Sequence, residues 1–201
     1  MISRNAIELI IRFEVGNKTY YSKFLHRPTL KDSESGIVIG IGYDLGFTYK
    51  AQLIADWEGN INPNYFPLLF KVLGLTGVAA KQMFSTELQK VNIPFMNAYE
   101  VFAKKTIPRG YLMAKSIFPQ IDDLNEDTKG ALVSLVLSRG TNLEGETREE
   151  MREIVDFVRY KDYEAIADAI ERSKKHFEEK GLDDSVRRRE AEADLILNSL
   201  L

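Results

Sequence analysis

Two acidic residues lie where a carboxylate could act in general acid–base catalysis. Glu14 follows Phe13 and directly precedes a Val-Gly pair, at the expected end of an amphipathic helix. A carboxyl group held against apolar neighbours loses hydration, which raises its pKa and keeps a proton available near neutral pH. Asp44 lies in the segment 36–46, whose closely spaced glycines permit sharp turns and the close approach of a ligand. From the residues alone, Glu14 is therefore a candidate general acid, and Asp44 is a second acid at the edge of an expected element.

Other catalytic chemistries find little support in the sequence. His26 and His176 are far apart, and neither belongs to a His-Glu-x-x-His pattern. With no cysteine in the chain, we expect no zinc or other metal site. The serines lack the Gly-x-Ser-x-Gly context of a hydrolase nucleophile, and the glycine-rich segment 36–46 lacks the Lys-Ser or Lys-Thr of a phosphate loop. We expect no cofactor.

Length and charge point to an ordinary globular protein. With 201 residues, we expect a single domain over 1–201, and the absence of cysteine excludes disulfides. The 27 basic and 30 acidic side chains nearly cancel to a net charge of -3, so we expect no long-range attraction to nucleic acid. We expect a monomer.

The pattern of the first thirteen residues indicates whether the chain begins with a signal peptide. Charged residues interrupt their apolar pattern, so we expect no signal peptide there, and we expect no membrane span elsewhere. The protein would then be made in the cytoplasm and reach its site of action by release or export, or be secreted with a leader that this chain lacks.

Helices must position most of these residues. Ser3 is a candidate N-cap for a helix over residues 3–14, whereas residues 17–44 have the pattern of a small sheet with turns. Residues 131–137 are apolar on nearly every side, so we expect the helix over 126–138 to lie at the centre of the helical part. The charged run 187–193 is expected to form a solvated helix face. The remaining expected helices cover residues 49–57, 65–73, 76–91, 95–103, 109–117, 147–160, 163–180 and 184–200.

Several of these stretches resemble the phage lysozyme family, and in particular the pesticin-like muramidases. The matching parts are Phe13-Glu14-Val15-Gly16, a following Tyr, the segment from Ser35 to Gly46, and the helix that ends at Ser138, Arg139 and Gly140. The resemblance implies an α+β fold, predominantly α, with a small β-containing lobe over roughly 15–48 and a larger helical lobe on the other side of a cleft. Residues 51–120 are the least diagnostic part.

The resemblance also implies roles for individual residues. Glu14 would protonate the glycosidic oxygen, and Asp44 would be the second carboxylate; in other members of the family that acid lies earlier, at the position of Asp32. Val38 occupies a position where the family has a threonine that holds the attacking water, and Ser138 stands where the family commonly has asparagine. Tyr43 and Arg139 would complete the surroundings of the cleft.

The resulting hypothesis is a glycoside hydrolase, a lysozyme that cleaves peptidoglycan between N-acetylmuramic acid and N-acetylglucosamine with inversion at the anomeric carbon. Its partner would be the glycan strand, and an immunity or delivery protein could act with it. Because valine has no hydroxyl, the alternative is a catalytically weakened lysozyme-fold protein that binds glycan or a protein partner. A third alternative is a helical interaction domain in which Glu14 and Asp44 never meet.

Overall fold

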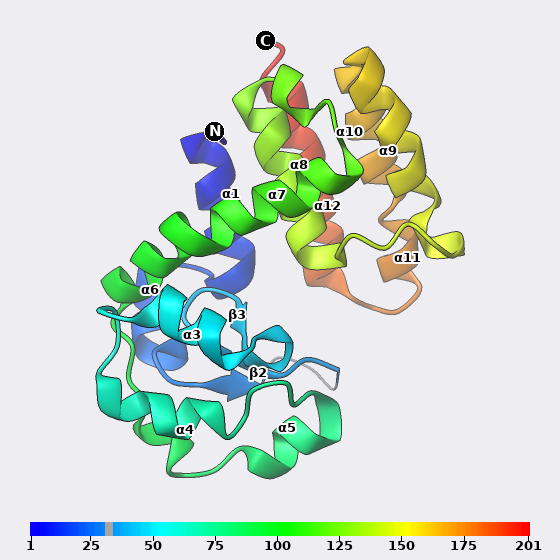
Figure 1. Cartoon of the computed structure of the whole chain (residues 1–201). Coiled ribbons are helices and arrows are strands. Elements are labelled where there is room, and N and C mark those ends of the chain that lie inside the picture. The colour runs from blue at the N-terminus through cyan, green and yellow to red at the C-terminus, as the bar shows by residue number, and fades with distance from the viewer. Residues whose placement is uncertain (31–33) are drawn as a thin grey trace. The chain divides into compact units, whose positions relative to one another are not determined.

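Helices make up most of the structure, a computed structural model that describes residues 1–30 and 34–201 (Figure 1). The strands of this part form one three-stranded antiparallel sheet in the order β1-β2-β3, so the predicted class, α+β and mainly helical, is confirmed. The chain divides into two compact units, which are Met1–Phe13 together with Pro108–Leu201, and the continuous segment Glu14–Ile107.

Each unit has its own set of elements. The segment Glu14–Ile107 contains α2 (Lys18–Tyr20), β1 (Thr29–Leu30), β2 (Ile37–Ile39), β3 (Tyr43–Asp44), α3 (Lys50–Trp57), α4 (Phe66–Phe70), α5 (Gly77–Met83) and α6 (Phe95–Val101). The other unit contains, wholly or mainly, α1 (Arg4–Val15), α7 (Ile107–Ile117), α8 (Glu126–Arg139), α9 (Glu149–Tyr160), α10 (Tyr163–Arg172), α11 (Lys175–Glu178) and α12 (Asp183–Asn198).

Helix α8 is the central helix of the unit built from both ends of the chain. Its residues from Gly130 to Val136 are all buried, as the sequence predicts. Helix α12 packs along it, and α1 approaches so closely that a Cβ on Gly130 would lie 2.0 Å from the Cβ of Ala6. The predicted N-cap of α1 is also confirmed, because the Ser3 hydroxyl accepts a hydrogen bond from the Ala6 N–H. Glycine at position 130 thus sets the distance between α1 and α8.

Replacing Gly130 with alanine is expected to destabilise the protein by about 1–3 kcal/mol. Alanine has the better helix propensity by roughly 1 kcal/mol, but the added methyl group overlaps Ala6 in a packed core, and relieving that overlap must shift a helix. Thermal unfolding followed by circular dichroism measures the change. The double variant Ala6→Gly/Gly130→Ala is the control, since it removes the opposing methyl group. If the double variant is no more stable than Gly130→Ala, the helix contact is not the cause.

Three charged residues of the run in α12, Arg188, Arg189 and Glu192, are buried, so the expectation of a solvated face is wrong for them. Arg189 and Glu192 are 1% and 0% exposed. Arg189 Nη2 donates to Glu192 Oε1 at 2.7 Å, and Ser134 Oγ of α8 donates to the same oxygen at 2.5 Å. Arg188 Nε donates to Ser134 Oγ at 3.0 Å. The charges can be buried because they pair with each other and with hydroxyl groups of α8.

The unit Glu14–Ile107 has its core next to the sheet. Ile37 and Ile39 of β2 are buried, and Tyr43 of β3 packs edge-on against Trp57 of α3, with the ring centroids 5.4 Å apart. Helices α3 to α6 belong to the same unit, so that unit continues to Ile107. We expected the β-containing lobe to end near residue 48.

Several local expectations are wrong. The helix expected over 76–91 ends at Met83, and the helix expected over 163–180 is divided into α10 and α11. Residues 18–25 are helical rather than part of a sheet, as α2 followed by the π-helical turn Tyr21–Leu25. The Asn17 side chain caps this segment by accepting from the Tyr20 N–H at 2.9 Å. In addition, no loop separates α6 from α7. The π-helical turn Phe102–Thr106 joins them, and its wider winding accommodates Pro108, which has no N–H to donate.

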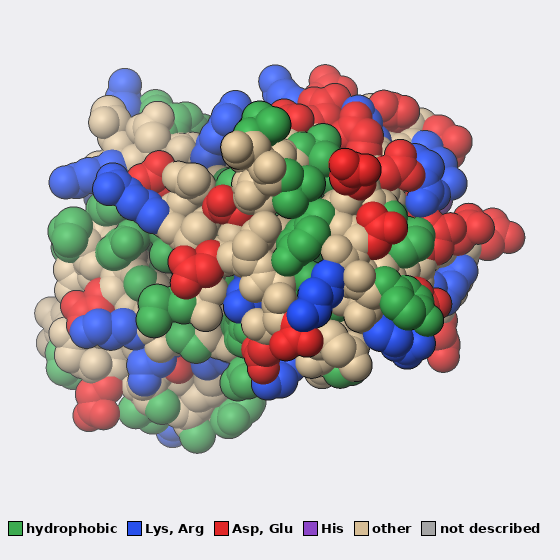
Figure 2. All heavy atoms as spheres, turned by 90° about the horizontal axis from the view of Figure 1, so that it is seen from above, with side chains coloured by type: hydrophobic (Ala, Val, Ile, Leu, Met, Phe, Trp, Pro, Cys, Tyr) green, Lys and Arg blue, Asp and Glu red, His purple; other side chains and the backbone are tan. Residues whose placement is uncertain are grey.

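Charges on the surface are mixed in sign. On the face seen in Figure 2, Lys and Arg side chains lie among Asp and Glu side chains. Arg172, for example, forms exposed ion pairs with Glu153 at 2.5 Å and with Asp168 at 2.7 Å. None of the helices in the described residues combines the length and apolarity needed to cross a bilayer.

Candidate active site

Glu14 lies in the last turn of α1, against the turn between β2 and β3. The side chain is half-buried, and a Cβ built on Gly42 would lie 2.7 Å from Glu14 Oε2. Gly42 also has a φ of +66°, a conformation that side chains rarely adopt. Glycine is therefore needed at position 42 both for the turn and for the close approach of the Glu14 carboxyl group.

Asp44 is two residues beyond Gly42, at the end of β3, and backbone donors hold its carboxylate. The Gly46 N–H donates to Asp44 Oδ1 at 2.7 Å, and the Gly36 N–H donates to Oδ2 at 3.2 Å. These two bonds tie the start of β2 and the turn after β3 to one carboxylate. Asp44 is thus a rigidly held anion, with backbone amides in place of part of its hydration shell.

The register of the sheet places Val38 directly opposite Asp44. Val38 pairs with Asp44 on one side and with Thr29 on the other, so these three residues form a row across β1, β2 and β3. Residues directly opposite in antiparallel strands project to the same face of the sheet. The row therefore carries a hydroxyl, an isopropyl group and a carboxylate side by side, and the hydroxyl that Val38 lacks is present on the neighbouring strand, at Thr29.

Tyr43 takes part in the core rather than in this row. It is 5% exposed, its hydroxyl donates to Asp56 Oδ2 at 2.7 Å, and it precedes Asp44 in β3, so the two side chains leave the strand on opposite faces. The structure thus gives Tyr43 a packing role on the α3 side of the sheet, and does not bring its side chain together with that of Asp44.

Ser138 and Arg139 belong to the other unit, at the end of α8. Ser138 Oγ accepts from Arg189 Nη2 at 2.9 Å. Arg139 donates to the Thr147 carbonyl and lies over the Phe177 ring, 5.2 Å from the ring centroid. Burial lowers the pKa of Arg139 to about 10. These contacts connect the end of α8 to neighbouring segments of its own unit.

Asp32, the alternative second carboxylate, lies outside the described residues. Of the expected site residues, the structure brings Val38 and Asp44 together in the sheet and places Glu14 at the turn that leads to Asp44. Sequence reasoning missed Thr29, because nothing in the Arg-Pro-Thr stretch signals which residue of β1 will face Val38. Only the strand register reveals that neighbour.

Comparison with known proteins gives one result that bears on this site. Residues 13–106 match a family model described as a domain of unknown function (DUF8812), which covers just under half of the chain. The matched range coincides, to within one residue at each end, with the compact unit Glu14–Ile107. Glu14, Val38 and Asp44 all lie in it. No curated protein matches the chain.

Proposed function

We propose that the protein is a muramidase of the phage lysozyme type, related to the pesticin-like muramidases, which hydrolyses the bond between N-acetylmuramic acid and N-acetylglucosamine in peptidoglycan. The observation that carries the proposal is the contact of the Glu14 carboxyl group with the β2–β3 turn at Gly42, two residues before the anchored Asp44. Glu14 and Asp44, the two acids of the sequence motif, thus lie at one end of a small sheet within one compact unit.

Glu14 serves as the general acid in this proposal. It donates its proton to the glycosidic oxygen as the bond to the anomeric carbon breaks, so that the leaving sugar departs as a neutral alcohol. The position at a helix end suits this role, because the half-buried side chain lies against the β2–β3 turn that leads to Asp44. The positive charge that develops on the sugar ring must then be stabilised by a second group.

Asp44 serves as that second group. Its two backbone hydrogen bonds fix the carboxylate in place, which suits a group that stabilises an oxocarbenium-like transition state or orients a water molecule. An inverting reaction needs the two carboxyl groups about 6.5–9.5 Å apart, so that water fits between them. The water gives one proton to the carboxylate and its oxygen forms the new bond to the anomeric carbon.

The test is digestion of purified peptidoglycan, followed by mass spectrometry of the released fragments. The proposal expects fragments with a reducing N-acetylmuramic acid end that incorporate one oxygen atom from ¹⁸O-labelled water. Reducing N-acetylglucosamine ends would show that the other glycosidic bond is cut. Anhydro-muramic ends would show that the reaction is a transglycosylation without water. Either result would overturn the assignment, as would the absence of fragments from folded protein.

A second candidate function is glycan or partner binding with weak or no catalysis, and Val38 is the observation that favours it. Val38 lies directly opposite Asp44, where a water held by Asp44 would gain a second anchor from a hydroxyl but receives none from an isopropyl group. Thr29 lies on the far side of Val38 in the same row, roughly one strand spacing farther away, or about 5 Å.

Replacing Val38 with threonine is therefore expected to raise the rate of peptidoglycan cleavage by about tenfold or more, since positioning of the nucleophile contributes strongly to catalysis. Release of soluble fragments from labelled cell walls measures the rate. Val38→Ala is the control, because it removes bulk without adding a hydroxyl. A protein that binds cell walls but releases nothing in either variant would favour the binding function.

A further inference from the structure

Two neighbouring arginine side chains, Arg139 at the end of α8 and Arg189 in α12, carry hydrogen-bond donors that nothing described so far uses. Arg189 is 1% exposed, and its Nε and Nη1 atoms are buried without a hydrogen-bond partner among residues 1–30 and 34–201. Arg139 Nη1 is buried without a partner in the same part of the chain. Buried donors of a charged group are costly to leave unsatisfied, so these three atoms indicate a bound ligand.

The two guanidinium groups lie close together. Ser138, next to Arg139 in α8, accepts a hydrogen bond from Arg189 Nη2 at 2.9 Å. The Cζ atoms of both arginines lie over the ring of Phe177 in α11, 5.2 Å from its centroid for Arg139 and 6.0 Å for Arg189. Burial lowers the pKa of Arg189, and repulsion from Arg139 adds to that shift. The unpartnered donors therefore border one small region beside the Phe177 ring.

This region lacks a counter-charge for Arg139. Among the residues that the structure describes, Arg139 forms no ion pair, and the two carboxylates that act on its charge are Glu150 and Glu192. Both are already paired. Glu192 Oε1 accepts from Arg189 at 2.7 Å, and Glu150 Oε1 lies 2.8 Å from Lys175 Nζ. A largely buried guanidinium group is thus left without a negative partner, which is unfavourable unless an ion from solution supplies one.

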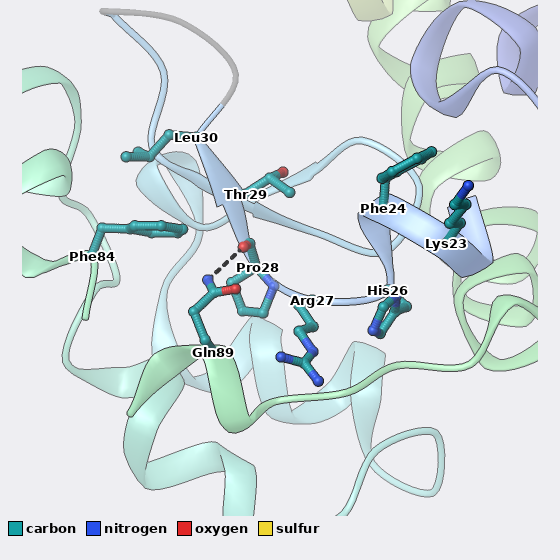
Figure 3. Close-up of a pocket in the computed structure, with 9 residues that line it drawn as sticks. All are labelled: Lys23, Phe24, His26, Arg27, Pro28, Thr29, Leu30, Phe84 and Gln89. Carbon is teal, nitrogen blue, oxygen red and sulfur yellow. Dashed lines mark hydrogen bonds between the residues drawn. The ribbon is translucent and has the colours of Figure 1, made fainter. Parts of the chain in front are cut away.

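Exposed cations elsewhere in the chain have no such need. Lys23 and Arg27 line the pocket beside β1 (Figure 3), and both are exposed, so water solvates their charges. The donors of Arg139 and Arg189 differ, because burial has replaced the water around them with protein atoms. The need for a counter-ion is therefore a property of the end of α8 rather than of cations in general.

We propose that a small inorganic anion such as chloride binds between Arg139 and Arg189, and accepts hydrogen bonds from Arg139 Nη1 and from Nε and Nη1 of Arg189. A monatomic anion suits the region because Arg189 is almost fully enclosed. The ion would connect the end of α8 to α12 and so stabilise the unit that these helices share. Because Glu14 and Asp44 take no part in the site, the inference is independent of the proposed muramidase function.

Water is the competing occupant, and it would serve the region differently. Glu192 Oε2 is also buried without a partner in the described part of the chain, and a water molecule could donate to that oxygen while it accepts from an arginine. Water brings no negative charge to Arg139, however. An anion and a water molecule therefore predict different responses to chloride.

The experiment measures the melting temperature by circular dichroism while sodium chloride replaces sodium gluconate, at a constant ionic strength of about 0.5 M so that general screening does not change. We expect the parent to melt about 4 °C or more higher in chloride, because a ligand that binds only the folded state stabilises it. Arg139→Gln should reduce that rise to about 1 °C or less, since it removes the uncompensated charge. Arg187→Gln is the matched control, because Arg187 is an exposed arginine near the site in sequence, and it should keep the full rise.

Crystals of the parent grown in sodium bromide give a second measurement that needs no variant. We expect the anomalous signal of a bromide ion in contact with both Arg139 and Arg189. Equal melting temperatures in chloride and gluconate would overturn the inference, as would a water molecule without anomalous signal at this position, and either result would assign the region to water. A rise that Arg139→Gln keeps in full would also overturn it, because chloride would then act elsewhere on the protein.

Discussion

Replacing Glu14 with glutamine is expected to lower the rate of peptidoglycan cleavage by about 100- to 10,000-fold, which is the usual contribution of a general acid. Glutamine keeps the size and shape of the side chain at the β2–β3 turn, so the contact with Gly42 is retained. What it loses is the proton that, in the proposed mechanism, passes to the leaving oxygen. Release of reducing ends from purified cell walls gives the rate, and co-sedimentation with intact walls gives the binding, which should remain within a few-fold of the parent.

Glu8→Gln is the matched control for this experiment. Glu8 belongs to the same helix, is exposed, and pairs with Arg4 at 2.8 Å, so its loss should change the rate by less than twofold. A Glu14→Gln protein that keeps a rate within a few-fold of the parent would remove Glu14 from the mechanism. Equal losses in both variants would point to damage to α1 rather than to lost chemistry.

Replacing Glu192 with glutamine is expected to destabilise the protein by about 3–5 kcal/mol, the cost of breaking a buried ion pair from one side. The Glu192 side chain is fully buried and receives hydrogen bonds from Arg189 and Ser134. Burial lowers the pKa of Arg189 to about 10. The attraction of Glu192 opposes this shift, whereas repulsion from Arg188 and Arg139 adds to it. Without the carboxylate, these buried guanidinium groups would repel each other with less compensation.

Thermal unfolding followed by circular dichroism should show this loss as a melting temperature about 10 °C lower. Arg187→Gln is the matched control, because Arg187 lies in the same arginine run but is exposed and pairs with the exposed Asp184, and its loss should cost less than about 0.5 kcal/mol. The double variant Arg189→Met/Glu192→Leu should recover part of the stability, since it removes both partners of the 2.7 Å pair, while Arg188 loses Glu192 but keeps its hydrogen bond to Ser134. Equal shifts for Glu192→Gln and Arg187→Gln would contradict this account.

Sequence patterns predicted the helices that are buried on every side or that begin at a capping side chain. The helix around residues 131–137 was predictable because apolar residues surround it on every side, and α1 was predictable because Ser3 precedes its apolar periodicity. Residues 18–25 misled the prediction because their threonine and tyrosines favour strands, whereas the Asn17 cap and the burial of Tyr21 make the segment helical. In this segment, tertiary packing outweighed the local preference of these residues for strands.

The candidate site was predictable only in part. Glu14 and Asp44 could be singled out from their neighbours in the sequence, but the placement of Val38 between Thr29 and Asp44 depends on strand register, which no local pattern encodes. The burial of Arg189 and Glu192 was missed for a different reason. A run of charges at spacings of three and four residues also describes an exposed helix, and only the serines on α8 reveal that this run has partners inside the protein.

The contact of Gly130 with Ala6 has a consequence for the order in which the chain folds during synthesis. The partners of α1 on α8 lie more than a hundred residues later in the chain, as the hydrogen bond between Ser3 and Asp127 illustrates. In contrast, every contact within Glu14–Ile107 can form once those residues have left the ribosome. The apolar face of α1 must therefore wait, uncovered, until α8 has been made. On a nascent chain this first helix is a natural binding site for chaperones, and the intermediate that precedes α8 is the stage most exposed to aggregation.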